Sequence, residues 1–142
     1  MRKYQRVQAQ VIFDGIIKED PNYINAYYQR GIIHQYYKKD SLAILDYTVV
    51  SEKHNDKDTA SKAHTKILDI LFKKEESCSS QSKKHIAALK SLDSDNYKGS
   101  LYDGICKLHS GEFQESVNEL TKAYNLNHEN KISLYYRARA EI

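Results

Sequence analysis

The sequence predicts an all-α fold of about eight helices and no strands, and three observations carry this prediction. Small, bulky and apolar residues recur at a spacing that places them on one side of a helix. This pattern repeats along the chain at the interval of a helical-repeat protein, about 34 residues. The 142 residues also include only one proline and five glycines, which is too few for the many turns of a β-sandwich.

One type of predicted helix carries a stripe of three residues. A small residue is followed four positions later by a bulky one, and then three positions later by an apolar one. The bulky side chain fills space, while the small one lets a neighbouring helix come close. The stripe occurs four times, as two pairs related by the repeat interval: Ala9, Phe13 and Ile16 with Ala43, Tyr47 and Val50, and Ser82, Ile86 and Leu89 with Ser116, Leu120 and Ala123.

A second type of helix lies between these stripes. Its pattern appears in three places, at Tyr27-x-x-Arg30-Gly31-x-x-His34, Ser100-x-x-Asp103-Gly104-x-x-Lys107 and Leu134-x-x-Arg137-Ala138-x-x-Glu141. We expect the small residues Gly31, Gly104 and Ala138 to hold positions where two helices cross. The interval from Gly31 to Gly104 equals two repeats and a short insertion.

The helices follow one another with short turns. Asp20-Pro21-Asn22 is a signal that stops a helix and starts a turn, and residues 93–96 and Ser110-Gly111 have the same role. The insertion lies between Val50 and Ser82. The predicted helices cover residues 4–20, 23–37, 40–54, 58–74, 79–92, 97–109, 112–126 and 131–142.

This arrangement resembles the tetratricopeptide repeat (TPR) family, whose helix–turn–helix motif of about 34 residues reads W-x2-L-G-x2-Y, then A-x3-F, then P. The resemblance covers essentially the whole chain. It is best over NAYYQRGIIHQYYKKDSLAILDYTVV and over GEFQESVNELTKAYNLN, where Gly111 and Phe113 match the turn between helices, and weakest over residues 57–82. It implies a right-handed superhelical solenoid of antiparallel helix pairs.

The same resemblance implies a single array with a particular division. A half repeat occupies residues 1–22, full repeats occupy 23–56, 57–96 and 97–130, and a half repeat occupies 131–142. Because both ends cut through a repeat, and solenoids usually need capping units, we expect a longer array or one that ends against another chain.

In TPR proteins the first helices of the repeats line a concave surface that binds a partner. Tyrosine suits such a surface because it combines contact area, a hydroxyl group and a low entropy cost. For each tyrosine, filling the core is the alternative. The groove residues that the resemblance implies are Tyr28, Gln29, Ile32, Gln35, Tyr36, Lys66, Asp69, Tyr102, Ile105, His109, Tyr136 and Arg139.

One subclass of the family grips the acidic tails of heat-shock chaperones with a carboxylate clamp of Lys, Asn and Arg side chains. Here Tyr28 and Ile32 stand in the first Lys and Asn places. Lys98 could match a later Lys, but Tyr102 stands where Arg belongs. We therefore do not expect a chaperone carboxylate clamp.

The sequence contains no pattern that predicts catalysis, a metal site or a cofactor site. His34 lies on the packed stripe of its helix, which favours a core histidine. His109 precedes Ser110, but no third group is placed to orient such a pair. HExxH, GxxxxGK[ST] and GxGxxG are absent. We therefore expect neither an enzyme nor a cofactor.

Charge and cysteine content indicate which class of partner and which cellular compartment to expect. The net charge of +3 is spread evenly, with 11 basic and 9 acidic residues in 1–71 and 11 and 10 in 72–142, so no nucleic-acid partner is expected. Cys78 and Cys106 form no metal-binding spacing, and we expect reduced thiols in a cytoplasmic protein. No apolar run approaches the roughly 18 residues of a membrane span.

The sequence thus predicts a protein–protein interaction module or scaffold. A concave groove would bind a partner peptide, helix or protein surface within a multi-protein assembly. One alternative is an RNA-binding helical repeat like the pentatricopeptide and half-a-TPR proteins, although 5 Arg against 17 Lys argue against it. Another is a non-catalytic targeting arm of a larger enzyme. Serines at 77–82 could be phosphorylated or simply form a solvated loop.

Overall fold

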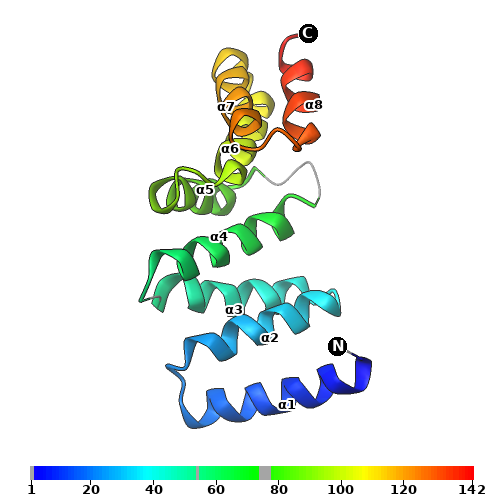
Figure 1. Ribbon diagram of the computed structural model, residues 1–142, viewed down its shortest axis with the longest axis vertical. Coiled ribbons are helices and arrows are strands. Elements are labelled where there is room, and N and C mark those ends of the chain that lie inside the picture. Colours follow the sequence, from blue (N-terminus) through cyan, green and yellow to red (C-terminus); the bar gives the residue numbers. More distant parts are fainter. Residues whose placement is uncertain (1, 54, 74–77) are drawn as a thin grey trace. The chain divides into compact units, whose positions relative to one another are not determined.

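A computed structural model describes residues 2–53, 55–73 and 78–142, which form eight α-helices and no strand (Figure 1). The chain divides into two compact units, an N-terminal unit (Met1–Ile70) and a C-terminal unit (Leu71–Ile142). The helices are α1 (Lys3–Glu19), α2 (Ile24–Tyr36), α3 (Asp40–Lys53), α4 (Lys57–Leu71), α5 (Ser80–Leu92), α6 (Tyr97–His109), α7 (Phe113–Leu126) and α8 (Lys131–Ala140).

The all-α fold and the order of the helices confirm the sequence-based prediction. Most helix ends fall within two residues of the predicted ones. The helix predicted over 58–74 ends earlier, at Leu71, with a turn at 72–73. Residues 54 and 74, included in predicted helices, and Ser77 of the serine-rich segment lie outside the described residues. Consecutive helices pack together from α1 to α3 and from α5 to α8, and the superhelical solenoid remains a prediction.

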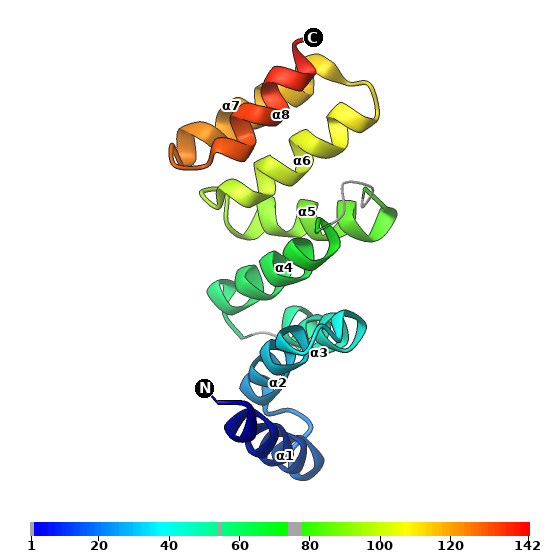
Figure 2. The ribbon, with the colours of Figure 1, turned by 90° about the vertical axis from the view of Figure 1, so that its right-hand side faces the viewer.

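The stripe on α3 forms the centre of the N-terminal unit. Ala43, Tyr47 and Val50 are fully buried. Gly31 allows α2 to lie close against α3 (Figure 2), because a Cβ atom at position 31 would lie 2.7 Å from Cε1 of Tyr47. The predicted crossing at Gly31 is therefore confirmed. The corresponding stripe on α1 is only half-buried.

The C-terminal unit repeats this crossing at the second glycine of the pattern. A Cβ atom at Gly104 on α6 would lie 2.6 Å from Cγ of Leu120 on α7. The hydroxyl of Ser116, which is fully buried, donates a hydrogen bond of 2.7 Å to the carbonyl oxygen of Gly104. The stripes on α5 and α7 are buried as predicted. The expected crossing at Ala138 is wrong, because Ala138 is exposed on α8.

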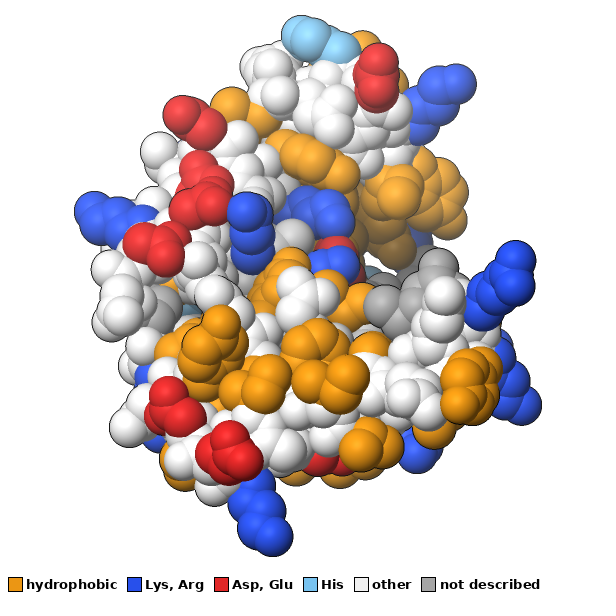
Figure 3. All heavy atoms as spheres, turned by 60° about the horizontal axis from the view of Figure 1, so that its bottom comes forward, with side chains coloured by type: hydrophobic (Ala, Val, Ile, Leu, Met, Phe, Trp, Pro, Cys, Tyr) orange, Lys and Arg blue, Asp and Glu red, His pale blue; other side chains and the backbone are white. Residues whose placement is uncertain are grey.

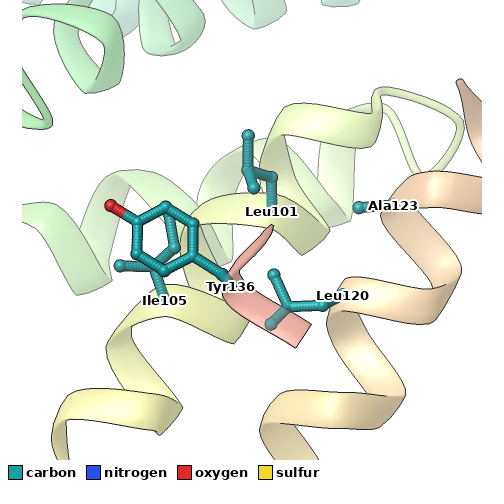
Figure 4. Close-up of a cluster of buried hydrophobic side chains, with 5 residues drawn as sticks. All are labelled: Leu101, Ile105, Leu120, Ala123 and Tyr136. Carbon is teal, nitrogen blue, oxygen red and sulfur yellow. The ribbon is translucent and has the colours of Figure 1, made fainter. Parts of the chain in front are cut away.

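Three consecutive helices supply the hydrophobic core of the C-terminal unit. Leu101 and Ile105 come from α6, Leu120 and Ala123 from α7, and Tyr136 from α8 (Figure 4). Each is at most 9% exposed. This cluster excludes water from the centre of the unit, so its burial contributes hydrophobic stability to the unit.

Each unit also contains an ionic triad that joins three consecutive helices. In the N-terminal unit, Arg30 on α2 lies 2.9 Å from Asp14 on α1 and 2.7 Å from Asp46 on α3. In the C-terminal unit, Lys90 on α5 lies 2.7 Å from Asp103 on α6 and 2.9 Å from Glu119 on α7. Asp14 is exposed, but the other groups are partly or fully buried, so water screens their pairs less than surface pairs.

The turns inside the two main helix pairs share a left-handed backbone. Lys38, between α2 and α3, has a φ of 57°, and Gly111, between α6 and α7, has a φ of 81°. The interval between these two residues is the same as that between the crossing glycines. Glycine adopts this conformation without strain, while lysine does so at a cost of about 1 kcal/mol. The turn geometry is therefore preserved even where the sequence lacks glycine.

A disulfide bond joins Cys78, in the segment before α5, to Cys106 on α6. Their Cα atoms are 5.4 Å apart, a usual separation for this bond. The expectation of reduced thiols is therefore wrong. It failed because nothing in the sequence signals a pairing between these two cysteines, and the packing of α6 brings them together. Among the described residues, no helix is long and apolar enough to cross a membrane.

The buried stripe leads to a test of the packing on α3. Ala43→Leu is expected to lower the free energy of unfolding by about 1–3 kcal/mol, because the added atoms have no space at this fully buried position. The measurement is urea unfolding followed by circular dichroism. Leu45→Ala, at an exposed position on the same helix, is the control and should change little. An Ala43→Leu variant as stable as the parent would contradict the packing of α3.

Candidate partner-binding surface

The outward side of α2 carries a stripe of exposed side chains. Gln29 is exposed, Ile32 is 38% exposed and Tyr36 is 55% exposed. Their spacing of three and four residues places them on one side of the helix. The structure therefore brings these three predicted groove residues together.

Tyr28 and Gln35 border this stripe and connect it to the core. The ring of Tyr28 is half-buried, with its centroid 5.7 Å from that of Tyr47. Burial raises the pKa of Tyr28 above its ordinary value. The hydroxyl of Tyr47 donates a hydrogen bond of 3.0 Å to Oε1 of Gln35. Both border residues are thus held in place, and the neutral phenol of Tyr28 can donate a hydrogen bond.

The two predicted groove residues of α4 are Lys66 and Asp69, and both are half-buried. Near the start of the same helix, Lys62 and Asp58 form an ion pair of 2.8 Å. Lys62 and Asp58 have opposing effects on the pKa of Tyr28, since Lys62 lowers it and Asp58 raises it. The N-terminal unit therefore places charged groups beside the aromatic border of the α2 stripe.

The C-terminal unit places its predicted groove residues differently. Tyr102 is half-buried and stacks on Phe72, with ring centroids 4.3 Å apart. Ile105 and Tyr136 lie in the hydrophobic core, where they are 4% and 9% exposed. They therefore have little surface for a partner. The position of Tyr136 matches the alternative given for the tyrosines, that the ring fills the core, whereas the expected exposure of Ile105 is wrong.

His109 and Arg139 are the remaining predicted residues of the C-terminal unit. His109 is exposed, and its Nδ1 lies 3.9 Å from Sγ of Cys78. Arg139 is half-buried, with its guanidinium carbon 5.7 Å and 5.4 Å from the ring centroids of Tyr135 and Tyr136. Such contacts hold a cation over an aromatic face. The exposed ring of Tyr135 and the side chain of Arg139 therefore lie next to each other on the surface of α8.

One contact at the candidate surface was not predicted from the sequence. The guanidinium carbon of Arg6, on α1, lies 3.5 Å above the ring centroid of Tyr36. The two residues belong to different helices and no repeat spacing relates them, so nothing in the sequence signalled the contact. It gives the end of the α2 stripe a fixed positive charge.

The structure also shows what the described side chains can do chemically. In the described ranges, no group of three or more His, Cys, Asp or Glu side chains is arranged to hold a metal ion.

An open hollow of about 300 Å³ lies between the α1–α2 and α3–α4 turns, and polar residues such as Asp20, Asn25 and Asp56 line it. The carboxylates of Asp20 and Asp56 already accept backbone hydrogen bonds from Asn22 and Thr59. These features are typical of turns that are stabilised by their own side chains.

His34 provides a test of the buried polar groups behind the α2 stripe. It is 7% exposed, and its Nε2 lies 3.6 Å from Oδ2 of Asp46. Burial lowers the pKa of His34 below 6.5, although Asp46 opposes this effect. As the pH falls through 6.5, the unfolded chain therefore takes up a proton that the folded chain does not.

The expected result is a loss of stability on acidification that depends on His34. The free energy of unfolding should fall by at most about 1.4 kcal/mol per pH unit below the unfolded pKa. Chemical unfolding between about pH 7 and about pH 5 measures this slope. His34→Gln, which keeps a donor toward Asp46, should give a smaller slope, and an unchanged slope would contradict the assignment.

No protein-family model matches the chain, and no match was found among curated proteins.

Proposed function

We propose that this chain is a non-catalytic helical-repeat module of the TPR kind that binds another protein. The observation that carries the proposal is the outward stripe of α2, with Gln29, Ile32 and Tyr36 exposed on one side. The residues that pack the helices form separate, buried stripes, so the outward stripe stays exposed apart from the face of Tyr36 that Arg6 covers. The repeated crossings at Gly31 and Gly104 support the helical-repeat assignment.

The chemistry of the stripe favours a partner with an apolar anchor and an acidic group. Ile32 and the rings of Tyr28 and Tyr36 offer apolar contact area, which is typical of interface anchors. Arg6 over Tyr36 adds a positive charge at one end. A partner helix or peptide with an acidic residue next to an apolar one would match both features. The tyrosine and isoleucine in the clamp positions again disfavour the chaperone carboxylate clamp.

RNA binding is the second candidate, and it has less support. The lysines are spread over turns and both types of helix, whereas a nucleic-acid site needs clustered positive charge. A role as a targeting arm of a larger enzyme is compatible with the same α2 surface. The disulfide favours an oxidising compartment over the cytoplasm, because disulfides rarely persist in the reducing cytosol.

The first test identifies and localises the partner. Crosslinking mass spectrometry on a captured complex should give crosslinks from Lys39 or Lys66, which lie on or next to the helices of the proposed surface. A synthetic peptide from the crosslinked segment then allows affinity to be measured by calorimetry. Crosslinks confined to α5 or α7 would contradict the proposed surface.

The second test distinguishes binding through apolar anchor residues from binding through charged residues. Ile32→Ala is expected to cost about 2 kcal/mol of binding free energy at unchanged fold, because anchors in an interface contribute most of the affinity. Leu45→Ala removes an exposed leucine from α3 and is the matched control. Binding to a single-stranded RNA oligonucleotide should be weak and of the non-specific kind. Tight, salt-sensitive RNA binding that survives Ile32→Ala would instead establish the RNA alternative.

A further inference from the structure

The two sulfur atoms of the Cys78–Cys106 disulfide differ in their access to solvent. Cys106 lies on α6 and is 5% exposed. Cys78 is half-buried and lies outside any helix, in the segment that leads into α5. A reagent in solution can therefore reach Sγ of Cys78 far more easily than Sγ of Cys106. Exposed disulfides are typically the labile, regulatory or catalytic ones, whereas structural disulfides resist reduction.

Two neighbours of Cys78 favour a thiolate at this position when the bond is open. The first is His109, whose Nδ1 lies 3.9 Å from Sγ of Cys78. The second is the start of α5. Cys78 directly precedes Ser79, which caps this helix by accepting a hydrogen bond of 3.2 Å from the backbone nitrogen of Ser82. An imidazole group and a helix N-terminus both stabilise a negatively charged sulfur, so Cys78 has the surroundings of a reactive cysteine.

The charged groups near the other sulfur are balanced. An open hollow of about 290 Å³ lies beside Cys106. The charged side chains that line this hollow are Lys83, Asp103, Lys107 and Glu112. Two are positive and two are negative, and Lys107 lies 3.4 Å from Asp103. Their effects on a thiolate largely offset each other, so His109 is the side chain whose removal should change the reactivity of the site.

We propose that Cys78 and Cys106 form a reversible thiol–disulfide exchange site for a small thiol of the glutathione class. Cys78 is the cysteine that bonds to the small thiol, and Cys106 is the resolving cysteine that displaces it. His109 stabilises the charge on Sγ of Cys78. The site shares no residue with the α2 stripe of the proposed function or with the exposed apolar side chains of α1, the side that comes forward in Figure 3.

The exchange proceeds in two steps, starting from the dithiol form and glutathione disulfide. The Cys78 thiolate attacks one sulfur of glutathione disulfide, whose S–S bond breaks, and one glutathione leaves with a mixed disulfide on Cys78. Cys106 then loses its proton and attacks Sγ of Cys78, so the mixed disulfide breaks and the second glutathione leaves. The chain loses two electrons and one glutathione disulfide gains them. The two protons of the protein thiols end on the two glutathione thiols, and reduction runs through the same steps in reverse.

Titration of the parent chain with mixtures of glutathione and glutathione disulfide tests reversibility. After acid quenching, mass spectrometry should show disulfide and dithiol forms that interconvert as the mixture is changed in either direction. The mixed disulfide should be found on the peptide that contains Cys78. A chain that remains fully oxidised or fully reduced in every mixture would overturn the proposal, as would a mixed disulfide found mainly on Cys106.

Two matched variants assign the roles of the cysteines. Cys106→Ala removes the resolving cysteine, so glutathione disulfide should add one glutathionyl group to Cys78 that persists. Cys78→Ala leaves only the buried Cys106, which should remain unmodified in the folded chain. Both variants lack the disulfide, and circular dichroism verifies that both are folded. Equal modification of the two folded variants, or modification of neither, would overturn the assignment.

The role of His109 is tested in the Cys106→Ala chain. His109→Gln should slow the addition of glutathione to Cys78 about threefold or more, because a smaller fraction of the sulfur is thiolate. His128→Gln is the matched control, since His128 is an exposed histidine of the same unit whose ring lies 4.9 Å from that of Tyr124. It should leave the rate unchanged. An unchanged rate in His109→Gln, or equal slowing in both variants, would overturn the assistance by His109.

Discussion

Cleavage of the Cys78–Cys106 disulfide is expected to lower the free energy of unfolding by about 3.5 kcal/mol. The bond closes a loop over a sequence separation of 28 residues, and opening it restores conformational freedom to the unfolded chain. Cys78→Ser tests this without placing a new hydroxyl in the core, because Cys78 is only half-buried whereas Cys106 is 5% exposed. The measurement is guanidinium unfolding with and without a dithiol reductant.

The reductant provides the control for this prediction. The parent chain should lose stability when reduced, whereas Cys78→Ser should have nearly the same low stability in both conditions. If the parent chain unfolds at the same denaturant concentration with and without reductant, the bond does not contribute to stability. That result would instead agree with the reduced thiols and the cytoplasmic location expected from the sequence.

Gly104→Ala is expected to destabilise the C-terminal unit by about 1–3 kcal/mol, as overpacking of a buried contact typically does. The new Cβ would lie 2.6 Å from Cγ of Leu120 and 3.3 Å from its backbone nitrogen. Leu120 is fully buried, so its side chain has no free space to move into. Gly31→Ala should act in the same direction, because the ring of Tyr47 is equally enclosed.

Gly15→Ala is the matched control for the two crossing glycines. It lies in the interior of α1 with open space around it, and alanine favours a helix over glycine by up to about 1 kcal/mol. The Gly15→Ala variant should therefore be more stable than the parent chain, while the Gly104→Ala and Gly31→Ala variants should be less stable. Equal effects of all three substitutions on thermal unfolding would show that helix propensity, and not close packing, determines the result.

The predicted helices and their buried faces show how much of this fold is local. The positions of Ala43 and Tyr47 on one side of α3 follow from the helical period, which the sequence displays directly. Gly31 and Gly104 were predicted as crossings because a small residue recurs beside the same pattern, and close contacts exist at both. Ala138 has the same pattern but is exposed, because a small residue permits a crossing without requiring one.

The candidate site was predictable only in part. The stripe on α2 is exposed, since its period is also helical, and its role as part of a groove stays a prediction. Ile105 occupies a comparable place on α6 but is buried in the core of its unit. A helical pattern identifies one side of a helix, whereas the neighbours around that helix determine how many sides are covered.

Spacings within a few helical turns were enough to predict the all-α class, the order of the helices and the small residues at two crossings. Contacts between residues far apart in the sequence could be seen only in the tertiary structure. Packing joined Cys78 to Cys106, placed Arg6 over Tyr36, and grouped Arg30 with acidic residues 16 positions away on either side. These contacts depend on the angle and rotation of each helix against its neighbours, which arise from the packing of whole side-chain surfaces and not from a periodic pattern.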